Sequence, residues 1–161
     1  MSKEKDHKTN AIREMEAAGA HFEAHFFDCP EALSGVEVAA LLKQDPDCVF
    51  KTLVTQAKSG QHYVFMVPVA CELDLKKAAK AAGEKAISMI KSRELLPLTG
   101  YIHGGCSPVG MKKLFPTFID ETAELYDRIM FSGGRIGCQI ETSLAELQRV
   151  VPVTCADITV I

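Results

Sequence analysis

Lys51 is the residue whose setting most clearly points to chemistry. It lies inside the apolar run of residues 48–54 (CVFKTLV), where the alternation of a strand would place Val49 and Leu53 on its face. An ammonium group among apolar neighbours has two explanations. Its stem covers apolar surface while the charge reaches water, or the charge is directed into a pocket. The pattern alone favours the first explanation, so a role for Lys51 in a site needs further support.

Two glycine clusters in the second half of the chain could offer backbone amides to an anion. They are residues 100–110 (GYIHGGCSPVG) and 132–137 (SGGRIG). Glycine pairs adopt positive φ and let a ligand approach the amides, although they also form ordinary tight turns. Each cluster carries a serine, Ser107 or Ser132, and Pro108 would stiffen the first loop, which favours a functional role. Neither cluster has the spacing of a nucleotide-binding motif.

The cysteines and histidines form no recognisable metal or catalytic motif. The six cysteines all lie at least 17 residues apart, so the chain has no C-x-x-C pair. We therefore expect free thiols, no bound metal and no cofactor. His103 lies in the first glycine cluster, three residues before Cys106, and a position on a surface loop is the simpler explanation for it.

Length and composition limit the class of protein. A chain of 161 residues with a net charge of −3 and 47% hydrophobic residues suits one compact domain, and we expect a single domain over residues 1–161. Its apolar runs are too short to cross a bilayer, and residues 1–10 contain no apolar segment, so we expect a cytoplasmic protein without membrane contact. The slightly acidic balance argues against tight, autonomous binding to nucleic acid.

Helix and strand signals alternate irregularly along the chain. Helices are expected over 8–18, after the S-x-x-E capping box at Ser34, over 75–82, from Ser92 until Pro97 breaks it, and from Ser143 to about Val150. Strands are expected over 21–27, over 48–56 and 62–69 as a hairpin, and over 117–120, 125–131 and 138–141. Hairpins with interspersed helices predict an α+β fold with a largely antiparallel or mixed sheet.

Together and in this order, these motifs resemble the YbaK/EbsC family, whose fold is shared with the editing domain of bacterial prolyl-tRNA synthetases. The resemblance extends from about Thr9 to Ile158. The matching segments are 49–53 (VFKTL), 68–69 (PV), 73–78 (LDLKKA), 100–113 (GYIHGGCSPVGMKK), 132–134 (SGG) and 156–158 (ADI).

The resemblance implies an α+β fold with a mixed, barrel-like central sheet flanked by helices. It implies an aminoacyl-tRNA deacylase, a trans-editing hydrolase of the ester that joins an incorrect amino acid to the 3′ end of a tRNA. In the YbaK branch the substrate is Cys-tRNA(Pro), and the expected partners are the mischarged tRNA and prolyl-tRNA synthetase. The alternatives are a deacylase for another small mischarged aminoacyl-tRNA, charged with Ala or Ser, and a non-catalytic module that binds tRNA or the synthetase.

The resemblance also implies the site residues. Lys51 matches the central lysine of the family and Gly104 the glycine of its substrate loop, and we expect these two to be catalytic. Phe26 stands where the YbaK branch has a tyrosine and Gln139 where it has an aspartate, which concerns the amino acid accepted more than the reaction. The residues expected to bind substrate are Phe26, Gly105, Ser107, Ser132, Gly133, Gly134 and Gln139.

The residues and the implied reaction agree in their chemistry. Cleavage of an aminoacyl ester develops negative charge on the carbonyl oxygen, and the amides of Gly104 and Gly105 could stabilise that charge. Lys51 could hold the terminal adenosine phosphate or the substrate carbonyl. The attacking group is either a positioned water or the thiol of the cysteine substrate itself. We favour the thiol, since the sequence offers no evident general base. For free tRNA we expect weak, salt-sensitive binding.

Overall fold

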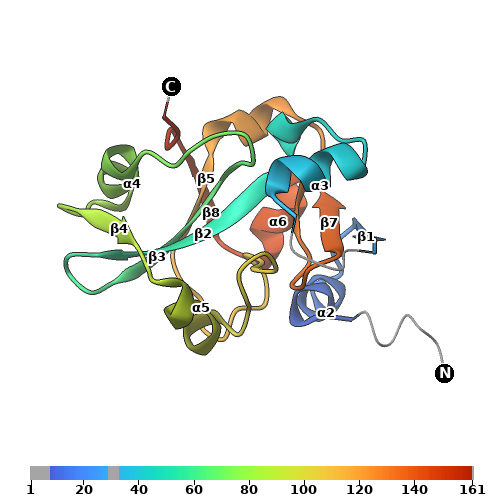
Figure 1. Cartoon of the computed structure of the whole chain (residues 1–161), viewed down its shortest axis with the longest axis horizontal. Helices are drawn as coiled ribbons and strands as arrows, with labels where there is room; N and C mark the ends of the chain where they lie inside the picture. Colours follow the sequence, from blue (N-terminus) through green and yellow to red (C-terminus); the bar gives the residue numbers. More distant parts are fainter. Residues whose placement is uncertain (1–7, 29–32, 161) are drawn as a thin grey trace.

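Two β-sheets form the centre of the protein. A computed structural model describes residues 8–28 and 33–160 (Figure 1). The three-stranded sheet has the order β1 (Phe22–Phe26), β7 (Cys138–Thr142), β6 (Ile129–Ser132). The five-stranded sheet has the order β4 (Ile87–Met89), β2 (Phe50–Ala57), β3 (His62–Pro68), β5 (Thr117–Asp120), β8 (Val153–Ala156).

The larger sheet is mixed and the smaller one is antiparallel. β2 pairs antiparallel with β3 and β4, whereas β3–β5 and β5–β8 are parallel. An isolated parallel bridge between Val49 and Met130 links the two sheets. The α+β class is confirmed. A barrel-like sheet is not, because the described strands form two sheets and no closed one.

Five α-helices of the described chain surround the sheets. They are α2 (Asn10–Ala17), α3 (Gly35–Leu41), α4 (Leu75–Ala82), α5 (Ser92–Thr99) and α6 (Leu144–Val150). Side chains cap the first turn of four of them, as the sequence signals suggest: Thr9, Ser34, Asp74 and Ser143 each accept a backbone N–H. The complete capping box of Ser34 and Glu37 is confirmed, and it fixes the start of α3.

The prediction that Pro97 breaks its helix is wrong, because α5 continues to Thr99. Proline removes one helical hydrogen bond, but the end of this short helix is well satisfied. The Thr99 hydroxyl donates to the Leu95 carbonyl oxygen at 2.7 Å, and the Gly100 amide donates to the Leu96 carbonyl oxygen at 2.8 Å. Gly100, at φ +87°, then ends the helix.

The predicted strand over 125–131 begins later than expected. A 3₁₀ helix occupies Glu121–Leu125, and β6 starts only at Ile129. The Asp120 side chain accepts the Thr122 amide and starts that helix in place of a strand. The other 3₁₀ helix of the described chain, Pro46–Cys48, leads into β2.

One apolar core ties the two sheets together. Phe50 and Met66 from the larger sheet pack with Phe131 and Ile140 from the smaller one, and Met15 of α2 joins them. Figure 1 shows α4 and β4 at one side of the molecule, and the three-stranded sheet with α2, α3 and α6 at the other. The strand that carries Lys51 pairs with β3 along almost its whole length and with β4 at its far end, and such a rigid element suits a precise site.

No helix of the described residues is long and apolar enough to cross a membrane.

Candidate active site

A pocket of about 230 Å³ opens where the two sheets meet. Its walls come from β2, the start of α3, the loop after α5, and facing residues of β6 and β7. It is lined by Leu33, Ser34, Gly35, Val38, Val49, Phe50, Lys51, Thr52, Leu53, Val69, Leu95, His103, Gly104, Cys106, Ser132 and Gln139. The structure thus brings together four of the residues predicted for the site, Lys51, Gly104, Ser132 and Gln139.

Lys51 supplies the positive charge of this pocket. Its side chain is 30% exposed, and its Nζ lies 3.8 Å from Oε1 of Glu72, whose side chain is 84% exposed. Such a solvated pair is weak, so the ammonium group remains able to interact with a bound ligand. Lys51 is the only Lys, Arg, Asp or Glu among the described residues that line the pocket.

The two glycine clusters meet backbone to backbone beside the pocket. Gly104 lines it with φ +88°, a conformation that favours glycine. A Cβ on Gly105 would lie 2.8 Å from Cα of Arg135 and 3.0 Å from the backbone nitrogen of Ile136. Only glycine permits this approach, which sets the loop of Gly104 against the loop that follows Ser132.

Two polar side chains of the pocket have no hydrogen-bond partner among the described residues. Thr52 Oγ1 and Gln139 Oε1 are buried and unpartnered. Leaving a buried polar group unpaired costs about 1–3 kcal/mol, so such groups call for an explanation. Thr52 was not among the predicted site residues. Its place next to Lys51 in the VFKTL segment was the available signal.

Comparison with known proteins agrees with this geometry. A family model described as the aminoacyl-tRNA editing domain matches residues 29–150. The chain belongs to that family. A protein of Enterococcus faecalis, described as a candidate Cys-tRNA(Pro)/Cys-tRNA(Cys) deacylase, EbsC, is 44% identical over 143 residues, or 88% of this chain and 87% of that protein. The predicted resemblance is thereby confirmed.

Solved structures show that the fold of this editing domain recurs. A structure described as a candidate trans-editing enzyme for prolyl-tRNA synthetase is 24% identical, with a TM-score of 0.84 over 94% of this chain and 96% of that one. A second, described as a hypothetical protein, is also 24% identical, with a TM-score of 0.86 over 94% and 100% of the two chains.

Five predicted site residues of the editing domain do not line the pocket. Ser107 is fully buried, and its Oγ accepts the Val109 amide at 3.3 Å, so it shapes its own loop. Phe26 is 43% exposed on β1, with the Arg135 guanidinium carbon 5.8 Å from its ring centroid. The remaining three, Gly105, Gly133 and Gly134, make close packing contacts that shape the two loops.

The cysteine in the pocket is not suited to attack an ester. Burial raises the pKa of the Cys106 thiol to about 12, which keeps it neutral near physiological pH. Burial likewise raises the pKa of Cys138, beneath the second glycine loop, to about 11. Free thiols are confirmed at the five described cysteines, whereas Cys29 lies outside the described residues.

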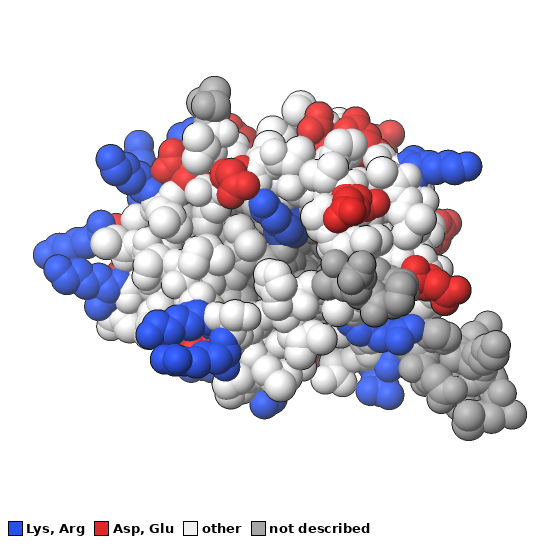
Figure 2. Space-filling view, in the orientation of Figure 1, with Lys and Arg blue, Asp and Glu red and all other residues white. Residues whose placement is uncertain are grey.

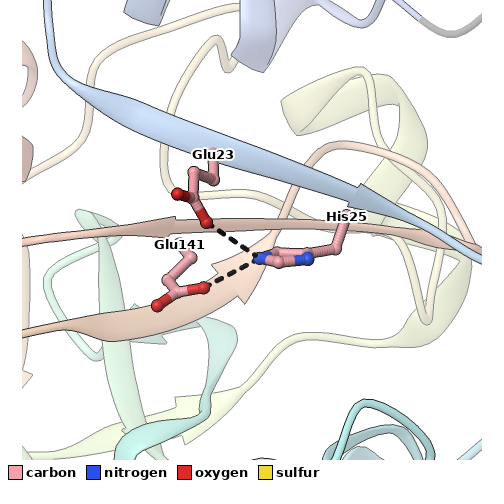
Figure 3. A group of neighbouring side chains, drawn as sticks. All are labelled: Glu23, His25 and Glu141. Carbon is pink, nitrogen blue, oxygen red and sulfur yellow. Dashed lines mark hydrogen bonds and ion pairs between the residues drawn. The ribbon is translucent and has the colours of Figure 1, made fainter.

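One group of side chains in the described residues could hold a metal ion. The ligand atoms of Glu23, His25 and Glu141 lie within 4.8 Å of one another on β1 and β7 (Figure 3). His25 Nε2 lies 2.8 Å from Glu141 Oε1 and 3.9 Å from Glu23 Oε2, and Arg128 Nε lies 3.1 Å from Glu141 Oε2. Arg128 pairs with Glu141 and the His25 ring hydrogen-bonds the same carboxylate, so contacts within the protein account for this group.

The contact of Gly133 with Cys138 gives a testable prediction. A Cβ on Gly133 would overlap Cys138 Sγ, so Gly133→Ala should lower the free energy of unfolding by about 1–3 kcal/mol. Cys138→Ala removes that sulfur, and the remaining Cys138 atoms lie at 3.4 Å, an ordinary contact. The double variant should therefore lose less stability in urea than the two single losses combined.

Gly134 offers the matched control. Its positive φ of +103° and contacts at 3.0–3.2 Å with Tyr101 and Thr9, and not Cys138, oppose a side chain there. The decreases in the free energy of unfolding caused by Gly134→Ala and by Cys138→Ala should therefore be additive in the double variant. If the decreases in the free energy of unfolding were also additive for Gly133→Ala and Cys138→Ala, the proposed overlap of the two side chains would be contradicted.

Proposed function

We propose that residues 1–161 act as one trans-editing deacylase domain, which hydrolyses the aminoacyl ester of mischarged Cys-tRNA(Pro). The observation that carries the proposal is that Lys51 of β2, the only Lys or Arg among the described residues that line the pocket, shares this small pocket with Gly104, which has φ +88°. Membership of the editing-domain family and 44% identity to the EbsC protein support the same reaction.

The pocket suits a small, weakly polar side chain. Its walls are largely apolar, with Val38, Val49, Leu53, Val69 and Leu95 contributing. A thiol loses little hydration in such surroundings, whereas a larger or charged side chain would fit poorly. We therefore place the cysteinyl side chain here, with the ester carbonyl near Lys51.

In the thiol route, the sulfur of the substrate attacks the carbonyl carbon of its own ester. A carbon–sulfur bond forms, negative charge develops on the carbonyl oxygen, and the bond to the ribose oxygen breaks. The ribose oxygen takes up the proton that the thiol lost. The products are a tRNA with a free terminal hydroxyl and a cyclic thiolactone, which water opens to cysteine. The protein then needs only to position the ester and to stabilise the oxyanion, through Lys51 and the amides near Gly104.

The 3′ end of the tRNA approaches over the basic side of the pocket mouth in this proposal. Leu95 of α5 lines the pocket, and the same helix exposes Arg93, with Lys91 at its start. Figure 2 shows basic side chains around α4, β4 and α5 and again at the opposite end of the molecule, and acidic ones mainly over the upper and right-hand parts of this face. So limited a basic surface fits weak, salt-sensitive binding of free tRNA in the cytoplasm and function beside prolyl-tRNA synthetase.

A deacylation panel tests the reaction. We expect Cys-tRNA(Pro) to be cleaved fastest among tRNA(Pro) charged with Cys, Ala, Ser or Pro, because only cysteine carries an internal thiol nucleophile. Equal rates for Ser or Ala esters would exclude the thiol route and favour attack by water. No turnover on any of the four would contradict the proposed enzyme and leave a binding module.

A further inference from the structure

Gln139 lies at the centre of the wall that the smaller sheet contributes to the pocket. In the register of the sheet it faces His25 of β1 on one side and Ser132 of β6 on the other. Gln139 and Ser132 both line the pocket. The hydroxyl of Ser132 accepts the Gly134 amide at 3.2 Å, whereas the amide oxygen of Gln139 has no partner in the described part of the chain.

The charged groups around the pocket determine which kind of ligand group can bind next to Gln139. Besides Lys51, the titratable side chains that line it in the described residues are His103, exposed at the mouth, and Cys106, a neutral thiol. Glu72 lies near Lys51 but is largely in solvent and is not part of the lining. Cys71 lies close enough to Lys51 and Glu72 to feel both charges, and desolvation raises its pKa, which keeps it a neutral thiol.

The carboxylates on the same face as Gln139 are already engaged. Glu141, two residues along β7, contacts His25 and Arg128, and Glu23 faces Glu141 in the register of the sheet with its Oε2 3.9 Å from His25 Nε2 (Figure 3). Neither carboxylate lines the pocket. No described wall therefore offers an anion to a positively charged group on the substrate, while Lys51 repels such a group.

The α-amino group of an aminoacyl ester is the substrate group that the lack of a nearby anion affects, because it can carry a positive charge. As an ammonium it has only donors and a positive charge, whereas as a neutral amine it has donors and one acceptor. An amide side chain also has both, so a neutral amine satisfies Gln139 in either orientation of the amide. The positive charge of Lys51 in the same pocket disfavours the ammonium form, and a free α-amino group, whose pKa is about 7.7–8.0, loses its proton near neutral pH at little cost.

We propose that Gln139 hydrogen-bonds the α-amino group of the substrate and that the pocket accepts this group in its neutral form. This inference rests on the proposed function, because it assumes that an aminoacyl ester occupies the pocket. Gln139 is then a specificity-determining residue. The rate of editing then depends on pH because the α-amino group of the substrate titrates, and not because a base of the protein does.

Calorimetry with a stable analogue tests the inference without turnover. The probe is 3′-amino-3′-deoxyadenosine that carries cysteine in amide linkage. A free α-amino group has a pKa of about 7.7–8.0, so at pH 6.5 the probe is protonated in solution. Binding to the wild-type protein should release about one proton, measured as the dependence of the binding enthalpy on the ionisation enthalpy of the buffer. Its affinity should fall about tenfold from pH 7 to pH 6.

The matched variants separate the role of Gln139 from other effects. Gln139→Glu supplies a carboxylate of the same shape, so the ammonium form should bind without proton release and with little pH dependence over this range. Gln56→Glu adds the same charge at an exposed position of β2 outside the pocket, and it should behave as the wild type. His103→Gln reports any proton that His103 contributes.

The outcomes distinguish this inference from the proposed function. Proton release by the wild type that Gln139→Glu abolishes supports the neutral-amine site. Binding of the probe by the wild type without proton release, while Cys-tRNA(Pro) is still cleaved, overturns the inference and leaves the deacylase in place. Failure to cleave any of the aminoacyl-tRNAs overturns the proposed function itself.

Discussion

Lys51→Met should lower kcat/KM for Cys-tRNA(Pro) by about 10²–10³-fold, the loss typical of removing one group that stabilises an oxyanion. Methionine keeps a long apolar stem against the walls of the pocket and removes only the charge. Lys51 is the only Lys, Arg, Asp or Glu among the described lining residues, so no neighbour replaces it. Its ion pair with Glu72 is solvated, and the free energy of unfolding should change by less than about 1 kcal/mol.

Single-turnover deacylation and urea unfolding measure the two effects separately. Lys58→Met is the matched control, because Lys58 is exposed in the turn between β2 and β3 and lies outside the pocket. It removes the same charge and should leave both quantities unchanged. Activity of Lys51→Met within about threefold of the wild type would show that Lys51 only covers apolar surface, the explanation that the sequence pattern alone favours.

Gly105→Ala should lower both the free energy of unfolding and the rate of deacylation. Its Cβ would lie 2.8–3.0 Å from the backbone of Arg135 and Ile136, which cannot move aside as a flexible side chain would. Separating the two loops should cost about 1–3 kcal/mol of stability. It should also displace Gly104 from Ser132 across the pocket, and a displacement of about 1 Å can cost about 10²-fold in rate.

Gly60→Ala is the control that separates a general loss of stability from a movement of the two loops at the pocket. Gly60 has φ +98° and open space around it, so alanine there meets only the backbone penalty of about 1–2 kcal/mol. Urea unfolding should show losses of similar size for both variants, and deacylation should fall only for Gly105→Ala. Full activity of Gly105→Ala would mean that the contact between the loops does not set the geometry of the pocket.

Local signals in the sequence predicted most of the elements. The capping box at Ser34, the cap at Asp74 and the αL glycine at Gly83 act within one turn of a helix, so the residues themselves contain the information. The prediction at Pro97 failed because it did not include the hydrogen bonds from the Thr99 hydroxyl to Leu95 and from the Gly100 amide to Leu96, which hold the last turn of the helix. The short strands β4 and β8 were missed, since three or four residues carry little periodicity, although β5, which is equally short, was predicted over 117–120.

The site was predictable in part. Lys51, Gly104, Ser132 and Gln139, which the resemblance assigns to the site, line one pocket of the structure. The contact of Gly105 with Arg135 joins residues 30 positions apart and depends on how two loops pack, which no local pattern contains. Such packing also gives the glycines of the second loop their close contacts.

The pocket lies between the two sheets, and each sheet contributes different polar side chains to it. Lys51 and Thr52 belong to the larger sheet, whereas Ser132 and Gln139 belong to the smaller one, and one isolated bridge between Val49 and Met130 joins the sheets near the pocket. In the proposed reaction, substitutions on β7 would therefore change which amino acid is accepted and leave the strand that carries Lys51 as it is. Substrate preference could then change independently of the proposed chemistry.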